Sequence, residues 1–158
     1  LALNKPIISV PTLEGLACNF YGTDALICPM MDARRKQVYT GIYHLAGGTE
    51  FTELVAQEAG PVEDIIKKCN EFGQKLGKQV VFLGDGVPVY RDIIEEFCTV
   101  EHFYAPAHLS RQRAGAVAIR AVTLYEEGKA EPASEHAPIY LRKSQAEREL
   151  EAKGKKLE

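Results

Sequence analysis

The sequence lacks the features of a membrane span, a disulfide framework and a zinc site. None of its apolar runs approaches the ~20 residues that would cross a bilayer. Its 4 cysteines show no C-x-x-C spacing, and cysteines inside apolar segments usually act as small hydrophobic residues. We therefore expect free thiols in a reducing cytosol, a cytoplasmic location and no contact with a membrane.

A large excess of either charge is also missing. The formal net charge is −3, and 26% of the 158 residues are charged. This balance gives no electrostatic reason to expect extensive binding to nucleic acid or to a membrane surface. With 46% hydrophobic residues, the chain is long enough to form one domain with its own core.

The patterns of nucleophilic and metal catalysis are missing as well. No serine or cysteine lies in a nucleophile elbow, and the 4 histidines have no metal-ligand spacing. The histidines are His44, His102, His108 and His136. We therefore predict neither a catalytic residue nor a metal-binding residue.

The most informative stretch that is present runs from Leu26 to Tyr43. A wholly apolar run up to Met31 predicts a buried strand, and Asp32 closes it. A charged turn follows, and then strict alternation predicts a second strand. Val38 and Ile42 fall on one face of this strand, and two tyrosines fall on the other.

The rest of the chain alternates between strand and helix patterns. Further strands are predicted at 6–10, 51–56, 80–83 and 100–104, and helices at 13–20, 61–76, 89–97 and 110–128. Thr12 is expected to cap the first helix. Three sequential strands, followed by strands that alternate with helices, predict an α/β fold. This order of elements is that of the ribonuclease-H-like lobe of the actin, Hsp70 and sugar-kinase superfamily. We therefore expect a mixed five-stranded sheet with helices on its faces.

The last predicted helix is the longest. Ser110 is expected to cap its start and Gly128 to end it. Its buried face is expected to contain Ala114, Val117, Ala118, Ala121 and Tyr125. Its solvated face is expected to contain Arg111, Arg113 and Arg120.

Two carboxylates follow the ends of predicted strands and could converge. Asp32 and Asp85 would then bind a divalent cation, as in a metal-dependent nuclease or phosphohydrolase. No third ligand identifies itself, and Arg34 and Arg35 would compete with the cation for Asp32. We favour the alternative, in which Asp32 caps its own turn and pairs with an arginine.

A second candidate is the turn Gly84-Asp85-Gly86, which lies between a buried strand and a helix. Small residues there allow backbone amides to approach a phosphate, so a vestigial nucleotide site is one interpretation. Glycines at such turns are also common for steric reasons alone. In the first hairpin, Ala33, Arg34 and Arg35 stand where a glycine-rich phosphate loop would lie, and their Cβ atoms obstruct close approach.

Four segments of the sequence carry a resemblance to a known family: Lys5–Leu13, Met31–Tyr39, Leu83–Gly86 and Pro138–Arg142. Within the hairpin, the residues that carry it are Asp32, Arg34, Arg35 and Tyr39. On these residues the chain resembles the bacterial TsaB (YeaZ) family of glycoprotease-like proteins of tRNA threonylcarbamoyladenosine synthesis. The resemblance extends from Leu1 to about Glu149.

This resemblance implies a two-lobed actin-like fold in the intact protein and a non-catalytic role. Members of the family support their modifying paralogue TsaD, and the ATPase TsaE joins them. Together they help to place a threonylcarbamoyl group on the adenosine beside the tRNA anticodon. ATP or ADP and Mg²⁺ are then expected only in the full complex. The resemblance implies that tRNA is contacted through that complex. Direct contact of tRNA with the arginines of the last helix is the less favoured alternative. A homodimer is left open. The peptidase label of the family finds no support in the residues.

The resemblance also divides the chain. Residues 1–23 would be the end of an N-terminal lobe with its connecting helix, 24–142 the C-terminal lobe, and 143–158 a charged, mobile tail. Most of the N-terminal lobe would be absent, which leaves open what pairs with the strand at 6–10. We predict self-association of the chain, or pairing of this strand in a non-native place.

Overall fold

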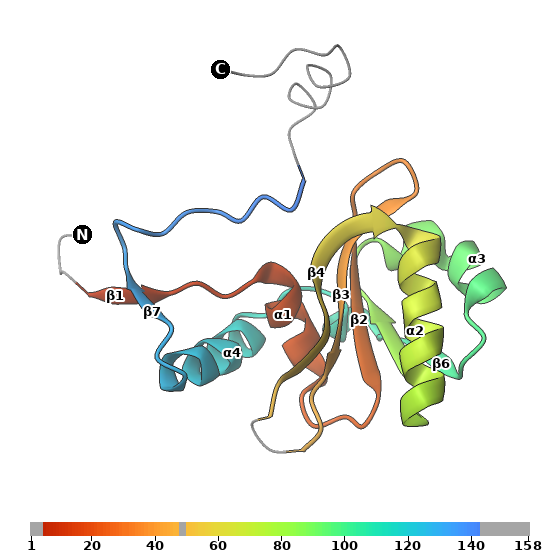
Figure 1. Ribbon diagram of the computed structural model, residues 1–158, viewed down its shortest axis with the longest axis horizontal. Coiled ribbons are helices and arrows are strands. Elements are labelled where there is room, and N and C mark those ends of the chain that lie inside the picture. The colour runs from red at the N-terminus through yellow and green to blue at the C-terminus, as the bar shows by residue number, and fades with distance from the viewer. Residues whose placement is uncertain (1–4, 48–49, 143–158) are drawn as a thin grey trace, which may run out of the picture.

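The computed structural model describes residues 5–47 and 50–142, which form a five-stranded sheet, a two-stranded ribbon and four α-helices (Figure 1). The strands are β1 Pro6–Ile8, β2 Leu26–Asp32, β3 Gln37–His44, β4 Thr52–Pro61, β5 Val80–Leu83, β6 His102–Tyr104 and β7 Ala130–Pro132. The α-helices are α1 Thr12–Ala17, α2 Val62–Leu76, α3 Val87–Phe97 and α4 Ala114–Glu126, with 3-10 turns at Cys18–Phe20 and Ala107–Leu109.

The main sheet has the order β4-β3-β2-β5-β6. Strands β2, β3 and β4 are antiparallel neighbours, whereas β5 and β6 run parallel to β2. This confirms the predicted mixed five-stranded sheet. The third strand is longer than predicted: it continues from Ala56 to Pro61 because β3 extends far enough to pair Tyr39 with Ala59.

Both faces of β2 are buried, which explains its unbroken apolar sequence. Alternate residues Leu26, Cys28 and Met30 pack with Val38 and Ile42 under α2 and α3. The opposite face of the sheet packs under α1, and α4 packs against α1 (Figure 1). The alternation predicted for β3 is confirmed, because its two tyrosines belong to this second cluster.

Helix α2 begins one residue later than predicted, because Pro61 is extended and ends β4. Its predicted end is confirmed: Gly77 has the left-handed conformation with φ of 63°. The predicted cap of α1 is wrong: Pro11 is the cap residue, Thr12 is already helical, and no side chain makes a capping hydrogen bond. No helix in the described part of the chain is long and apolar enough to cross a membrane.

The prediction for α4 is wrong at its start and on its faces. The helix begins at Ala114, after an extended Arg113, and it is shorter than α2. Its buried residues are Ala116, Arg120 and Leu124. Tyr125, which was expected in the core, is 63% exposed. The pattern failed because it assigned every charged residue to solvent.

Arg120 is buried because it pairs with the equally buried Glu14 of α1. The Arg120 Nε atom donates to Glu14 Oε2 over 2.6 Å, and the two residues are 6% and 8% exposed. The guanidinium carbon lies 3.8 Å from the centroid of the Phe51 ring, and Glu127 Oε1 lies 3.6 Å from its Nη1 atom. The Arg120 guanidinium therefore connects α4 to α1 and to Phe51, the residue before β4.

Strand β1 finds its partner within the chain. It pairs antiparallel with β7, with Pro6 opposite Pro132 and Ile8 opposite Ala130. Strand β7 is therefore the partner of the strand predicted at 6–10. Self-association stays a prediction. The calls on residues 1–4 and 143–158 lie outside the described residues.

The buried ion pair gives a stability prediction. Arg120→Ala should lower the free energy of unfolding by about 3–5 kcal/mol, because it leaves the Glu14 carboxylate buried without its cation. The double variant Glu14→Leu with Arg120→Met should lose less, since no charge is left unpaired. Urea unfolding followed by circular dichroism measures both.

The matched control is Lys67→Ala, which removes an exposed pair with Asp64 whose side chains are 65% and 58% exposed. It should cost less than about 1 kcal/mol. Equal losses for Arg120→Ala and Lys67→Ala would contradict the structural role of the buried pair.

Candidate functional site

The turn between β2 and β3 holds three consecutive residues in the left-handed conformation. Arg34, Arg35 and Lys36 have φ of 65°, 55° and 57°, a conformation that costs a non-glycine residue roughly 1–2 kcal/mol. Asp32 offsets part of this cost: its Oδ1 accepts the Arg34 amide over 2.8 Å, and its Oδ2 lies 3.1 Å from Nη1 of the same arginine. Asp32 thus holds the turn that follows it.

A tyrosine from α3 makes the third contact to Asp32. The Tyr90 hydroxyl donates to Asp32 Oδ1 over 2.7 Å. This bond, followed by that from the Arg34 amide, lowers the pKa of the Asp32 carboxyl below its ordinary value. Burial, and then Asp32 itself, raises the pKa of Tyr90. The carboxyl is therefore kept ionised by partners inside the protein.

The structure brings Asp85 beside Asp32, as the sequence allowed. Asp85 Oδ1 accepts the backbone amide of Asp32 over 3.1 Å, so this carboxylate supports the strand end. The carboxylate of Asp32 already faces a hydroxyl, an amide and the Arg34 guanidinium. Within the described residues, no three His, Cys, Asp or Glu side chains are grouped to hold a metal ion. These contacts disfavour the nuclease interpretation.

The glycines of the Gly84–Gly86 turn have a steric explanation. Gly84 has φ of 108°, and a Cβ atom on it would lie 2.2 Å from the Met30 carbonyl oxygen. A Cβ atom on Gly86 would lie 3.0 Å from the same oxygen. Only glycine permits this close approach of the turn to β2.

Two of the three backbone amides of this turn already donate within the protein. Gly86 N donates to the Met30 carbonyl over 2.9 Å, and Gly84 N donates to the Ser110 hydroxyl over 3.0 Å. Ser110 therefore serves this turn and does not cap α4. A phosphate at the turn would have to displace both bonds, which disfavours the nucleotide-binding interpretation of Gly84, Asp85 and Gly86.

Two of the segments that carry the family resemblance meet in space. The Arg142 Nη1 atom, at the end of the motif Pro138–Arg142, donates to the Ala33 carbonyl over 2.8 Å. Beside this contact, Met31 and Tyr39 line a groove of about 680 Å³ between the segment 135–142 and residues 9–13. The hairpin and the segment after β7 thus form one structural unit.

Comparison with known proteins identifies the family to which this chain belongs. The family described as "TsaD: tRNA N6-adenosine threonylcarbamoyltransferase" matches residues 1–150. The tRNA threonylcarbamoyladenosine biosynthesis protein TsaB of Bacillus subtilis (strain 168) is 32% identical over 146 residues, which are 92% of this chain and 60% of that protein. The chain belongs to the TsaD family, as a TsaB/YeaZ-type member.

Two solved structures from Pseudomonas aeruginosa share the fold of this TsaB/YeaZ-type chain. One is described as an uncharacterized protein with similarity to peptidase YeaZ, with a TM-score of 0.66 and 23% identity over 89% of this chain and 61% of that one. The other is YeaZ, with a TM-score of 0.63 and 20% identity over 88% of this chain and 62% of that one. The chain spans about three fifths of the length of these relatives.

A serine, a histidine and a glutamate do meet in the TsaB/YeaZ-type chain, which the sequence analysis missed. The Ser9 hydroxyl lies 2.7 Å from His136 Nδ1, and the same nitrogen lies 3.0 Å from Glu131 Oε1, to which Ser9 also donates. Because 127 positions separate Ser9 from His136, no local pattern could reveal this. In a catalytic triad the serine and the acid contact opposite ring nitrogens. Here both contact Nδ1, so the cluster fastens β7 and the following segment to residue 9 and lacks the geometry of a peptidase.

Gly84→Ala should destabilise the protein by about 3 kcal/mol or more, since it combines a positive φ with a steric overlap against the Met30 carbonyl. Gly77→Ala is the matched control: its φ is 63° and nothing lies within 4 Å of an added Cβ, so it should cost only about 1 kcal/mol. Chemical denaturation measures both. Equal losses would show that the close approach to β2 is unimportant.

Tyr90→Phe should raise the pKa of Asp32 towards its ordinary value, because it removes the largest contribution to the lowering. A lowered carboxyl pKa stabilises the fold above the ordinary value of about 3.9, and this stabilisation is lost as the pH falls through the folded-state pKa. Stability should therefore fall less steeply in Tyr90→Phe below about pH 4. Carboxyl NMR titration measures the pKa, with the exposed Tyr125→Phe as control; an unchanged Asp32 titration in Tyr90→Phe would contradict the assignment.

Proposed function

We propose that the chain is part of a non-catalytic accessory subunit in the synthesis of tRNA threonylcarbamoyladenosine. The observation that carries the proposal is the 32% identity over 146 residues to a protein named for this pathway. The membership in the TsaD family points to the same pathway. The role proposed is to bind a TsaD-type modifying subunit and to support it, with a TsaE-type ATPase joining the assembly and tRNA contacted through the complex.

The contacts at the strand ends support a role without catalysis. The carboxylates of Asp32 and Asp85 both accept hydrogen bonds from the protein itself. Amides that would cradle a phosphate donate to Met30 and to Ser110. Groups used in this way stabilise the fold, and using them in chemistry would require breaking these bonds first. ATP, ADP and Mg²⁺ are accordingly assigned to the other subunits of the complex.

The groove beside the hairpin gives the proposal a structural basis for support of a partner. One wall of the groove is the segment 135–142. This segment is held at one end by the cluster of Ser9, Glu131 and His136, and at the other end by the hydrogen bond of Arg142. Between these points, Ile139 and Tyr140 are 68% and 83% exposed. This extended segment is held at both ends and presents apolar side chains. A partner that binds it would therefore pay little conformational entropy to order the segment.

The test is reconstitution with the protein at its natural length. It should co-purify with a TsaD-type subunit, and adding it should restore threonylcarbamoyladenosine in tRNA, measured by mass spectrometry of the nucleosides. The double variant Asp32→Asn with Asp85→Asn, checked for folding, should keep the wild-type rate, because neither carboxylate takes part in the reaction.

Two results would overturn the proposal in different ways. Modification that proceeds equally well without the protein would remove it from the pathway. A folded double variant whose rate falls by about 10²-fold or more would keep it in the pathway but make the strand-end carboxylates catalytic.

A further inference from the structure

The turn between β2 and β3 carries three consecutive cations and protrudes beyond the main sheet (Figure 1). Arg34, Arg35 and Lys36 are exposed, and each has the left-handed backbone conformation that strains a residue with a side chain. Glycine would adopt this conformation without strain. Because backbone strain of this kind gathers at functional sites, the three cations point to a role beyond closing the hairpin.

The backbone of this turn is fixed by hydrogen bonds on both sides. Asp32 accepts the Arg34 amide, and the Lys36 carbonyl accepts the amide of Val62 at the start of α2 over 3.1 Å. Arg142 donates to the carbonyl just before the turn. The cations therefore project from an ordered backbone, and a ligand that binds them would lose little conformational entropy in fixing it.

The cations of the turn have few partners in the described part of the chain. Within residues 5–47 and 50–142, Arg35 and Lys36 form no ion pair. Arg34 pairs with Asp32, yet its side chain is 86% exposed. Arg35, Lys36 and Glu63 line a hollow of about 210 Å³ beside the start of α2. The positive charge of the turn is therefore accessible from solvent.

Two more arginines extend this positive surface. Arg111 and Arg113 are exposed, and they lie in the loop before α4, since the helix begins only at Ala114. Between them, the Nε2 atom of Gln112 lies 3.8 Å from Sδ of Met31, next to the end of β2. The structure thus places both arginines at the edge of the sheet where β2 ends.

The charges at this edge differ from those of the whole chain. Its cations are Arg34, Arg35, Lys36, Arg111, Arg113 and Arg142, and its carboxylates are Asp32, Asp85 and Glu63. The neighbouring Asp64 pairs with Lys67. Cations are in excess here although the whole chain has a net charge of −3, and a local excess of this kind attracts a polyanion.

We propose that this edge, with the turn 34–36 at its centre, contacts the phosphate backbone of RNA. Guanidinium groups match the geometry of phosphate oxygens, which they bind through paired hydrogen bonds. The turn offers no apolar side chain to enter a bilayer, which disfavours a lipid surface. The choice of RNA rests on the proposed function, and it adds a direct contact of this chain to the contact through the complex.

The first experiment is a titration of fluorescently labelled, unmodified tRNA with the chain at several salt concentrations. A few phosphate contacts give weak binding, with a dissociation constant of roughly 10⁻⁴ M at physiological salt, that tightens as salt is lowered. Arg35→Glu should weaken binding about tenfold at low salt and reduce the slope of log K against log salt by about one unit.

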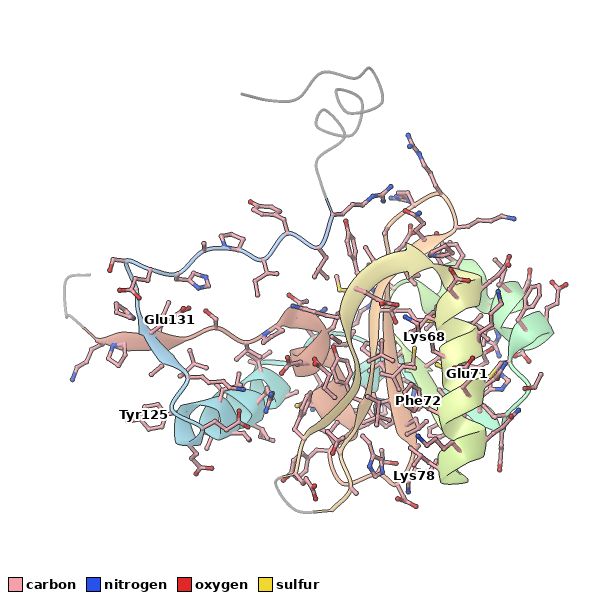
Figure 2. All side chains as sticks on the ribbon, viewed as in Figure 1. Lys68, Glu71, Phe72, Lys78, Tyr125 and Glu131 are labelled. Atoms are coloured by element: carbon pink, nitrogen blue, oxygen red, sulfur yellow. The ribbon has the colours of Figure 1, made fainter. Side chains whose placement is uncertain are left out.

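The matched control is Lys75→Glu, which changes the net charge equally. Lys75 is exposed near the end of α2, about 20 Å from the helix start at 1.5 Å per residue. In Figure 2, Lys78 marks this end of the helix, opposite the β2–β3 turn. Lys75→Glu should change the affinity less than about twofold. Absence of tRNA binding at the lowest salt, or equal losses in the two variants, would overturn the proposal.

The second experiment uses the strain of the turn. Arg35→Gly removes the cation together with the strain, so tRNA binding should weaken severalfold while the melting temperature stays or rises by about 2–4 °C. A side chain that served only the hairpin would give the opposite pattern. Unchanged tRNA binding, or a melting temperature that falls by several degrees, would contradict the role assigned to Arg35.

The third experiment separates RNA from other sources of phosphate. Sodium phosphate should displace the tRNA no better than sodium chloride of the same ionic strength, and vesicles of phosphatidylserine should not compete. Stronger displacement by phosphate would indicate a site for a free anion, and competition by vesicles would indicate a membrane surface; either result would overturn the proposal. These assays measure binding alone, so they can fail while reconstitution of tRNA modification succeeds, and the reverse.

Discussion

The architecture of the site depends on one close contact, between the Met30 carbonyl of β2 and the glycines that follow β5. At 2.2 Å from an imagined Cβ atom of Gly84, this oxygen admits no side chain. The contact starts α3 where its Tyr90 can reach Asp32. Asp32 in turn holds the left-handed turn, whose Ala33 carbonyl receives Arg142. A chain of short contacts thus runs from the middle of the sheet to the segment after β7.

The same contacts occupy polar groups at a place where α/β folds often bind ligands. A phosphate site needs free amides, and a metal site needs free carboxylate oxygens. Here the amides of Gly84 and Gly86 donate within the protein. The carboxylates of Asp32 and Asp85 accept within the protein. The strand ends of this chain therefore act as joints of the fold, as the proposed accessory role requires.

The sequence predicts the parts of this structure that depend on local periodicity. The alternation of β3, the apolar run of β2 and the Gly77 stop of α2 each reflect one face, one strand or one turn. Long-range polar contacts escape it. Arg120 and Glu14 are 106 positions apart, and Ser9 and His136 are 127 apart. Neither member of such a pair carries a local mark, because its burial is decided by a partner that only the fold brings near.

The error on α4 is informative for the same reason. Helical periodicity predicts that apolar residues are buried, and it therefore indicated the face with Ala118 and Tyr125. The fold instead buries Arg120, whose charge is matched by Glu14, and turns the apolar residues outward. Exposure of apolar side chains to water is unfavourable whichever way the helix faces. The periodicity was therefore a correct sign of an apolar helix face, but the buried pair of Arg120 and Glu14 decides that this face points to solvent.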